Sequence, residues 1–557
     1  MTLIDYIILI GYFIGIVTFG LWISRRIKSS DDYFRGNRKF KWWIMMGQAF
    51  STGTHAEMPV AQTGVTYNLG FATIWYQWKN MLITPFYWLI APFYRRSNRT
   101  TVGDIIEDRY GKIIGLMYSI FAMVFFVFIM GAMLQGAAKV ISVLSDNMIS
   151  PTGVVLAMTV AFIVYSFAGG LIAAAYTDFF QGLLIIVLSI MLIPLGLNDV
   201  GGFSGMREVL PEDFFDLMNS TSGIDGFTLA MLAVNGMVGI TAQPHMVAMC
   251  GTGNTERAGR IGQTFGSLVK RLVTIGWALT GLIVAAMVIK HGVTLEDPEY
   301  AFGYGARELL GPGLLGLMFA AIVAANMSSL STFMVNNGAL FTQNIYKEYI
   351  NPEAPDRKLL TMGRYSGLVL SLVAVLFALS IDNVLHAFLF TETIAAFVGI
   401  IFLGGVIWKR ANRYGAGAAV LVALVSYYWI NYSDTGELVL VYKWLPAPFG
   451  WAMLLGFAAF FIVSLLTKPE DPKRIEKFFD EMRRKSDSDT IGPDGKPPLA
   501  SETGDDLLLL DLPGWFRKDR WKNFFQRYRE DLIGFGLSWI FIGLIILLAW
   551  GILQIGG

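Results

Sequence analysis

The sequence predicts an all-α, polytopic membrane protein with about fourteen transmembrane helices. Of its residues, 54% are hydrophobic and only 15% are charged, which is far more apolar than a soluble domain of this length. The apolar runs are about 20 residues long, the length of a helix that crosses the hydrocarbon core, and polar segments separate them. Strands of a membrane β-barrel would be about half as long and would alternate in polarity, so we expect helices.

The first predicted span is 3–25, and its basic cluster follows the apolar stretch without a cleavage site. We therefore interpret it as a transmembrane helix and not as a signal peptide. The spans that follow are predicted, in chain order, at 42–66, 71–94, 114–144, 152–168, 174–197, 226–249, 260–290, 312–345, 361–381, 383–408, 414–432, 448–467 and 532–554.

Charge in the connecting segments predicts how the chain is oriented in the bilayer. The connections RRIKSSDDYFRGNRKFK, YRRSNRTTVGDIIEDRYGK and WKRANRYG are rich in Lys and Arg, whereas NDVGGFSGMREVLPEDFFD is acidic. Positively charged connections stay in the cytoplasm. We therefore expect a multi-pass protein of the plasma membrane, the cell inner membrane, with both termini outside.

One polar segment, 468–531, interrupts the apolar runs near the end of the chain. Its composition is that of a short amphipathic helix, a flexible linker and an aromatic-basic interfacial stretch, too small and too polar for an enzyme domain. We expect a cytoplasmic linker. The predicted organisation is thus a membrane-embedded body at 1–467, the linker at 468–531, and a C-terminal transmembrane helix at 532–557.

Two predicted spans contain residues that an uninterrupted membrane helix avoids. The second reads GQAFSTGTHAEMPVAQTGVTY and the seventh reads NGMVGITAQPHMVAMCG, and both place glycine and proline beside polar side chains. Broken helices in lipid indicate a lined cavity near the bilayer midplane. Each break opens a block of five spans, 42–197 and 226–408, and an odd number of spans gives the blocks opposite orientations. The core at 42–408 is therefore predicted to be a 5+5 inverted repeat of the kind found in secondary transporters.

The ninth span contains AANMSSLST, which places four hydroxyl groups near the middle of an apolar helix: Ser328, Ser329, Ser331 and Thr332. Any one of them is explained by a bond to its own helix or by close helix packing. Four within five residues instead suggest a site for a hard cation such as Na⁺, which prefers oxygen ligands.

Ionisable residues inside spans are the other candidates for function. Asp178, at the start of the sixth span, is either part of an ion path or a helix cap at the interface. Lys270 and Arg271 lie about ten residues into the eighth span, where one of them is explained by snorkelling to the membrane surface.

Other chemistries are disfavoured. His55, Glu57 and His245 are residue types that hold zinc, but the spacing H-x-E is not that of a zinc protease and no further His lies near in sequence. Cys250 is the only cysteine, and the net charge of +1 shows no bias toward nucleic acid. We expect no enzyme activity, no metal beyond sodium and no nucleic-acid partner. The lipid bilayer is an expected partner.

Several stretches resemble the sodium/solute symporter family, which includes sodium–glucose, sodium–proline, pantothenate and sialic acid transporters. YSFAGGLIAAAYTDFFQG at 165–182 and AAIVAANMSSLSTFMVNNGALFTQNIYK at 320–347 are similar to its most specific motifs. DDYFRGNRKFKWW at 31–43 and PEDPKRIEKFFDEM after the thirteenth span add weaker matches. The resemblance implies a leucine-transporter-like 5+5 inverted repeat with extra outer helices that works by alternating access.

The resemblance also implies sites. The family's main sodium site carries over to the Ser51 and Thr54 carbonyls together with Ala325, Ser328 and Ser329. A second sodium site, present in some members, would use Asp178, Ser331 and Thr332, with Ser328 shared between the two. Substrate positions carry over to Glu57, Gln62, Gln243, His245 and Lys270, with Tyr67 and Trp75 as outer closures.

The solute stays undecided between a sugar or polyol, an amino acid and a carboxylate. AQPHMVA resembles the proline and pantothenate branch, whereas AEMPVAQTG with Lys270 resembles the sugar branch. A basic residue and a histidine near the cavity favour a carboxylate or a polyol. We therefore expect a sodium-coupled symporter that imports a small polar organic solute by alternating access. The alternatives are a transporter-like solute sensor and a proton-coupled symporter of the same fold.

Overall fold

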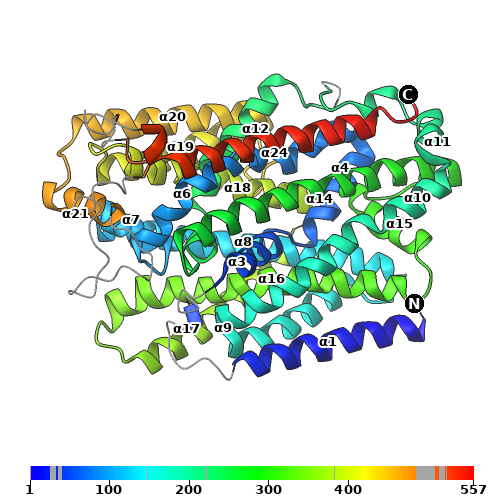
Figure 1. The fold of residues 1–557 in the computed structure, drawn as a ribbon, viewed down its shortest axis with the longest axis horizontal. Coiled ribbons are helices and arrows are strands. Elements are labelled where there is room, and N and C mark those ends of the chain that lie inside the picture. The colour runs from blue at the N-terminus through cyan, green and yellow to red at the C-terminus, as the bar shows by residue number, and fades with distance from the viewer. Residues whose placement is uncertain are drawn as a thin grey trace.

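A computed structural model describes residues 2–24, 33–34, 40–146, 148–219, 222–381, 383–483, 508–512, 521 and 524–557. Within these ranges all regular secondary-structure elements are helices, and β-pairing is limited to two isolated bridges. The long helices lie side by side in one elongated bundle (Figure 1). Nine helices in the described ranges are long and apolar enough to cross a membrane. The predicted all-α membrane fold is therefore confirmed, although this number does not establish fourteen spans.

The helices follow the order of the predicted spans. They are α1 (Leu3–Ser24), α3 (Trp42–Thr52), α4 (Glu57–Leu69), η2 (Phe71–Ile74), α5 (Trp75–Trp78), η3 (Lys79–Met81), α6 (Thr84–Ser97), α7 (Val102–Tyr110), α8 (Lys112–Leu144), α9 (Pro151–Ile190), α10 (Leu192–Val200), α11 (Gly202–Val209), η4 (Glu212–Phe215), α12 (Gly226–Gly239), η5 (Ile240–Ala242), α13 (Met246–Gly251), α14 (Glu256–His291), η6 (Pro298–Tyr300), α15 (Ala301–Leu309), α16 (Leu314–Leu340), the π-helix η7 (Phe341–Ile350), α17 (Asp356–Ala378), α18 (Val384–Ile407), α19 (Arg413–Thr435), α20 (Pro446–Leu466), α21 (Pro472–Met482), α23 (Phe524–Arg527) and α24 (Arg529–Leu553).

The second predicted span is broken, as expected from its glycine and proline. Helix α3 ends at Thr52, and the amide of Thr54 turns back to donate to the Ser51 carbonyl at 3.0 Å. Helix α4 begins at Glu57, so Pro59 falls in its first turn. Proline is tolerated there because the amides of a first turn have no partner within the helix.

The seventh predicted span is broken in the same way. Helix α12 and η5 end before Gln243, whose backbone is extended, and α13 begins at Met246. Pro244 favours an extended residue before it, which explains where the helix stops. The two breaks thus leave two short irregular segments inside the bundle.

The structure differs from the sequence prediction at the fifth and sixth spans. Where we expected separate helices at 152–168 and 174–197, α9 runs from Pro151 to Ile190 as one helical element. The break comes later, at Met191, before α10. Pro194 has no amide hydrogen to donate to the Ile190 carbonyl, so the helix is interrupted at that point instead of at the glycine pair 169–170.

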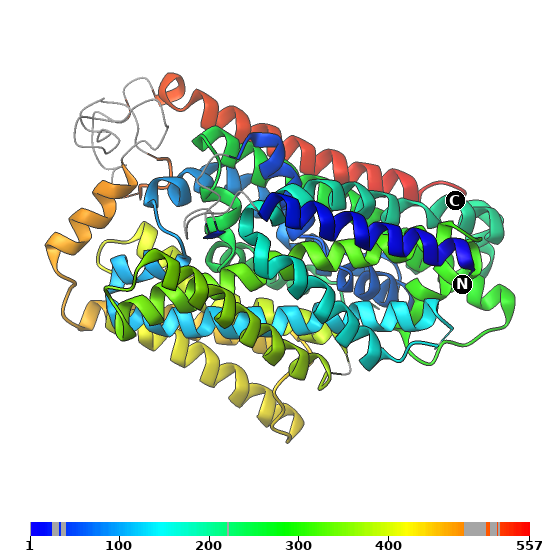
Figure 2. The ribbon, with the colours of Figure 1, turned by 90° about the horizontal axis from the view of Figure 1, so that it is seen from below.

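Packing places the breaks at the centre of the bundle. Helix α14 lies against α3, α4 and α6, whereas α16 lies against α9, α8, α17 and α1. Helices α1, α19 and α20 carry many exposed apolar side chains, which is the pattern of a lipid-facing layer. Figure 2 shows α1 and the C-terminal helix on the outside of the bundle, with both chain ends at the same end of the molecule.

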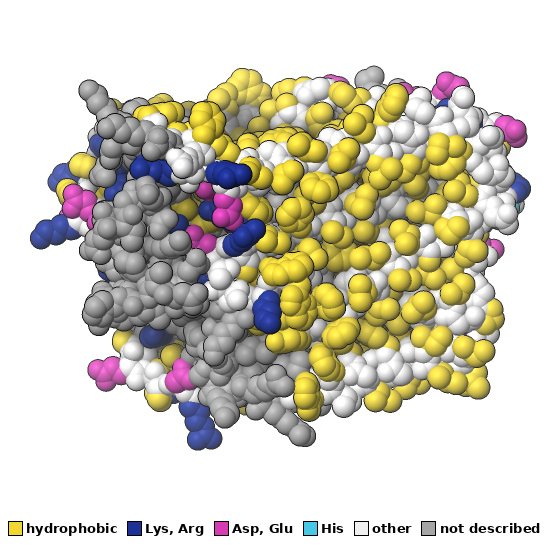
Figure 3. Space-filling view, viewed as in Figure 1, with side chains coloured by type: hydrophobic (Ala, Val, Ile, Leu, Met, Phe, Trp, Pro, Cys, Tyr) yellow, Lys and Arg dark blue, Asp and Glu magenta, His cyan; other side chains and the backbone are white. Residues whose placement is uncertain are grey.

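The surface carries the charge pattern of a membrane protein. In Figure 3, hydrophobic side chains cover a broad area of the visible face, and Lys and Arg side chains gather at the end opposite the two termini. Helix α21 lies at that charged end (Figure 1), where Phe478 and Phe479 are buried. Most of the predicted linker at 468–531 lies outside the described residues.

Candidate functional site

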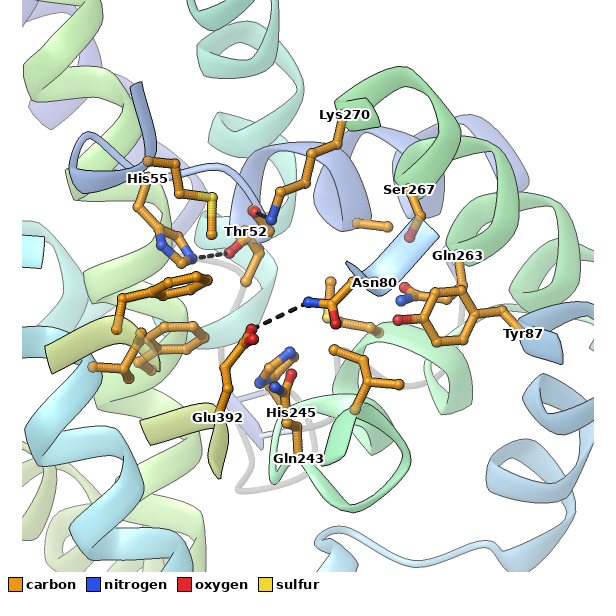
Figure 4. A pocket seen from close by; sticks show the side chains of 18 of the residues that line it. Thr52, His55, Asn80, Tyr87, Gln243, His245, Gln263, Ser267, Lys270 and Glu392 are labelled. Carbon is orange, nitrogen blue, oxygen red and sulfur yellow. Dashed lines mark hydrogen bonds between the residues drawn. The ribbon is translucent and has the colours of Figure 1, made fainter. Parts of the chain in front are cut away.

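A cavity of about 60 Å³ lies between the two helix breaks. Figure 4 shows side chains from α14, α18 and both broken segments pointing toward one another across it. Its lining residues are Ala49, Thr52, Gly53, His55, Met58, Asn80, Tyr87, Phe125, Ile129, Ile240, Gln243, His245, Met249, Gln263, Ser267, Lys270, Arg271, Phe333, Phe388 and Glu392. The cavity therefore combines a polar centre with aromatic and aliphatic walls, as small-molecule sites commonly do.

The hydroxyl of Ser329 meets the backbone at the first break. Its Oγ lies 3.4 Å from the Ser51 carbonyl oxygen and 3.0 Å from the Thr52 carbonyl oxygen, and it donates to them. Ala325 lies one helical turn earlier in α16 and is buried. The side chain of Ser328 lies outside the described part of the structure. Two carbonyls from a helix break and a hydroxyl from α16 thus converge on one point.

Thr54 occupies the break itself, and its hydroxyl donates to the Phe50 carbonyl at 2.6 Å. Sequence reasoning named Ser51 and Thr54 but not Thr52, whose carbonyl is the closer of the two that Ser329 contacts. Thr52 belongs to the stretch STGT at the predicted break, and every residue of an unwound segment exposes a carbonyl. Its position in that stretch was therefore the signal that could have identified it. The structure therefore adds Thr52 to the candidate residues.

A second group of oxygens lies next to the first. The Thr52 hydroxyl donates to Oδ2 of Asp178 at 3.0 Å, which joins α3 to α9. Ser331 Oγ and Thr332 Oγ1 are buried, and neither has a hydrogen-bond partner among the described residues. A buried hydroxyl normally has a partner, so these two oxygens are available to a ligand.

His55 belongs to the first break and lines the cavity. Its Nε2 lies 3.0 Å from the Thr52 carbonyl oxygen, and its Nδ1 contacts Oε1 of Glu57. The His55 ring also lies 5.8 Å from the Phe333 ring, and the His245 ring lies 5.4 Å from the same phenylalanine. A chain of contacts therefore leads from the carbonyl at the first break to the second break.

The predicted substrate residues divide into two groups. Gln243, His245 and Lys270 line the cavity. Glu57 and Gln62 are not among its described lining residues: Glu57 lies behind His55, and the Gln62 amide donates to the Thr66 hydroxyl at 2.8 Å within α4. The structure thus brings three of the five predicted residues to the cavity.

The two aromatic residues that we predicted as outer closures lie away from this cavity. Trp75 is buried, and its indole donates to the Leu217 carbonyl at 2.9 Å, while Tyr67 lies near the end of α4. Neither is among the described residues that line the cavity.

Sequence reasoning missed a buried ion pair at the edge of the cavity. Lys79 contacts Glu392 Oε2 and also donates to Asn235 Oδ1 at 2.9 Å, while Asn80 donates to Glu392 Oε1 at 3.1 Å. The signal was present, because Glu392 is a carboxylate inside the apolar run of α18, and such residues mark functional sites. Its partner in the ion pair, Lys79, lies more than 300 positions earlier in the chain, a pairing that a single sequence does not reveal.

Asn326 was also missed, although it belongs to the AANMSSLST stretch. Its Oδ1 accepts from the Ala56 amide at 3.0 Å, and its Nδ2 donates to the Met133 carbonyl at 2.8 Å. The side chain therefore satisfies an amide that the broken helix leaves without a helical partner, and it ties α16 to α8.

Comparison with known proteins places these features in context. A family model, the sodium:solute symporter family, matches residues 33–423. The osmoregulated proline transporter OpuE of Bacillus subtilis (strain 168) is 26% identical over 485 residues, which cover 84% of this chain and 95% of the relative. The sodium/glucose cotransporter of Vibrio parahaemolyticus is 24% identical over 474 residues, which cover 76% of this chain and 84% of the relative.

Solved structures share the fold. A Na⁺-coupled sialic acid symporter in a substrate-bound outward-open state has a TM-score of 0.70 at 20% identity, with 84% of this chain and 99% of that chain covered. A nucleobase-cation-symport-1 family transporter in a closed conformation has a TM-score of 0.52 at 14% identity, with 81% and 99% covered. The chain therefore shares the overall fold of these two transporters.

Proposed function

The chain belongs to the sodium:solute symporter family, and from this premise we propose which of its residues bind sodium and which bind the solute. It is a multi-pass membrane transporter and not an enzyme, and it couples the movement of a solute to that of sodium. Sodium is therefore a co-substrate. The assignments below concern where the two ligands bind and how binding drives transport.

The main sodium site that we propose consists of the Ser51 and Thr54 carbonyls, Ala325, Ser328 and Ser329, with the Thr52 carbonyl added. The contact of Ser329 Oγ with the Ser51 and Thr52 carbonyls is the observation that carries this proposal. Hard cations prefer neutral and carbonyl oxygens, and an unwound segment provides them without charge. A sodium ion here would hold α16 against the α3 break.

A second sodium ion is proposed beside the first, at Asp178, Ser331 and Thr332. The support is the hydrogen bond from Thr52 to Asp178 and the two buried hydroxyls, which have no hydrogen-bond partner within the described part of the chain. Because Thr52 takes part in both groups, filling one position would organise the other.

The solute is proposed to bind in the cavity between the breaks, where Gln243, His245 and Lys270 face inward (Figure 4). The relatives are named as carriers of proline and glucose, so we propose a small polar organic solute. Sodium would stabilise the arrangement of the first break that binds the solute, and alternating access would then release both ligands to the cytoplasm. We propose the plasma membrane, the cell inner membrane, as the location.

Uptake into proteoliposomes tests this mechanism. The purified protein is reconstituted and given a panel of labelled sugars, amino acids and carboxylates under an imposed Na⁺ gradient, a pH gradient or neither. We expect accumulation of one class above equilibrium under the Na⁺ gradient alone. Accumulation that needs only the pH gradient, or saturable binding without any transport, would contradict the proposal.

A further inference from the structure

Among the residues that the structure describes, Lys270 is a buried cation that takes part in no ion pair. It lies in the middle of α14, 7% exposed, and its ammonium group donates to the Gly53 carbonyl in the first break. None of the ion pairs between described residues includes Lys270 or its neighbour Arg271, which instead donates to the Gln77 carbonyl at 2.6 Å. Figure 4 shows the Lys270 side chain extending into the cavity toward Thr52.

The nearby carboxylates are already occupied. Glu392 lines the cavity, but Lys79 and Asn80 contact its two oxygens. Glu57 contacts His55 and is not among the described lining residues. The described lining thus contains two cations, Lys270 and Arg271, and one carboxylate that a third cation neutralises. The cavity therefore has a net positive charge.

Burying an ammonium group is costly unless an opposite charge and further hydrogen bonds compensate for its lost hydration. A carbonyl oxygen supplies a hydrogen bond but no countercharge. We propose that the transported solute supplies it: the substrate is a small carboxylate whose anionic group pairs with Lys270. This inference rests on the proposed function, because it takes the cavity between the breaks as the solute site.

The remaining lining defines the rest of the solute. His245 Nδ1 and Gln263 Oε1 are buried without partners among the described residues. Gln263 Oε1 can accept from a hydroxyl group, and His245 Nδ1 can accept from a hydroxyl or donate to a carbonyl, according to its tautomer. Ile240, Met249 and Phe333 form an apolar wall for a short carbon chain. Since no free carboxylate lines the described cavity, a substrate ammonium group would have no countercharge. A hydroxy acid or a sugar acid fits this lining better than an amino acid or an uncharged polyol.

The position of Lys270 also offers a physical reason for coupling. Gly53, its carbonyl partner, directly follows Thr52, whose carbonyl belongs to the proposed main sodium site. A carboxylate bound to Lys270 would lie between two positive charges inside a low-dielectric core and would attract both. Sodium should therefore strengthen carboxylate binding, and the carboxylate should strengthen sodium binding by the same factor.

Matched ligands test the inference on the purified full-length protein in detergent. Thermal unfolding is followed in Na⁺ or in K⁺ with lactate against lactamide and with gluconate against sorbitol, and proline serves as the zwitterion. At least one carboxylate should give a Na⁺-dependent stabilisation at a concentration at least about tenfold lower than its neutral counterpart requires. A panel in which no carboxylate exceeds its neutral counterpart, or in which proline exceeds both acids, would overturn the inference.

Variants of α14 make the test specific to Lys270. Lys270→Gln should abolish the preference for the carboxylate, whereas Lys270→Arg should keep part of it. Lys290→Gln, a change at the exposed end of the same helix, should have no effect on it. An unchanged preference in Lys270→Gln would also overturn the inference.

Failure of the inference and failure of the proposed function give different results. Stabilisation by Na⁺ alone that Ser329→Ala removes, together with equal responses to acid and neutral ligands, would reject the carboxylate and leave the symport mechanism intact. A protein that shows the same stability in Na⁺ and K⁺ under every condition would instead reject the sodium sites on which the mechanism depends.

Discussion

Thr52 shows how one residue can belong to two sites at once. Its carbonyl accepts from Ser329 Oγ at 3.0 Å and from His55 Nε2 at the same distance, while its hydroxyl donates to Asp178 at 3.0 Å. A helical residue would have its carbonyl occupied by an amide four positions later. The break at Gly53 frees that carbonyl for side chains and ions, so the local backbone conformation creates the site.

Ser329→Ala is the most direct test of the main sodium site. Loss of one hydroxyl ligand should raise the Na⁺ concentration for half-maximal uptake by about 5- to 30-fold, because a contact worth roughly 1–2 kcal/mol is removed. The measurement is the Na⁺ dependence of solute uptake at fixed solute concentration. Ser371→Ala is the matched control, because Ser371 is also buried but donates only to the Gly367 carbonyl of its own helix. Equal Na⁺ dependence in both variants would contradict the site.

Asp178→Asn should separate the second sodium ion from the first. The amide keeps the size of the side chain but removes the charge that would balance an additional cation. We expect the Hill coefficient of Na⁺-driven uptake to fall toward one, while the solute still needs Na⁺. A Hill coefficient that stays unchanged in this variant, or that already equals one in the native protein, would reject the second site.

At the residue scale, the sequence suggested candidates where a short stretch carried the information. The hydroxyls of AANMSSLST were found because four of them occur in an apolar run. Lys79 and Glu392 were missed because their pairing depends on how α18 packs against η3, and Glu57 was placed in the cavity although it contacts His55 behind it. Spacing along a chain predicts which residues share a helix face. It does not predict which of those side chains reach the cavity and which are covered by a neighbouring side chain.

Among the elements, α4 and η6 approach each other closely at Gly64. A Cβ added at Gly64 would lie 2.8 Å from the Pro298 carbonyl oxygen and 3.0 Å from the Glu299 Cα. Both neighbours are backbone atoms, which cannot rotate away as a flexible side chain could. Glycine at this position therefore lets α4, the second half of the broken helix, lie directly against the loop that precedes α15.

Gly64→Ala should destabilise the protein by about 1–3 kcal/mol, the usual cost of overpacking. The measurement is the midpoint of thermal unfolding in detergent, which should fall by several degrees. Gly543→Ala is the matched control: it is also a glycine within a helix, but its added Cβ would meet nothing within 4 Å. That change should leave stability equal or slightly higher, because alanine favours helix. Equal midpoints for the two variants would show that η6 moves aside at little cost.

Element boundaries were predictable only where the backbone chemistry is strict. Proline and glycine located both breaks in the core, because a missing amide hydrogen or a missing Cβ acts locally. The run 152–197 was wrongly divided at its glycine pair, since glycine permits a break without requiring one. The π-helix η7 was not predicted either, and its Asn344 contacts Thr101 and Asp104 near the start of α7.

For the whole molecule, the described structure contains an ion network that joins three elements at the end where the termini lie. Lys139 of α8 contacts Asp297 at 2.7 Å and Glu299 at 2.5 Å. Glu299 Oε1 also accepts from the amides of Val384 at 3.1 Å and Leu385 at 3.0 Å, at the start of α18. A carboxylate at a helix N-terminus is favourable, and here it fixes the loop before α15 against two long helices. No sequence pattern predicted this contact, because each partner comes from a different part of the chain.

The orientation of the molecule in the membrane is the remaining whole-molecule prediction. Lys and Arg gather at the end of the bundle where α21 lies, and both termini lie at the other end (Figures 1 and 3). The positive-inside rule predicts that α21 lies in the cytoplasm and that the termini lie outside.

Cys250 is the only cysteine of the sequence, and it is buried, so the native protein provides a low background for thiol labelling. Gln554 and Lys473 are both exposed and lie at opposite ends. With a membrane-impermeant maleimide on intact cells, Gln554→Cys should be labelled, whereas Lys473→Cys should be labelled only after permeabilisation. The reverse labelling pattern would contradict the predicted orientation and would place both termini in the cytoplasm.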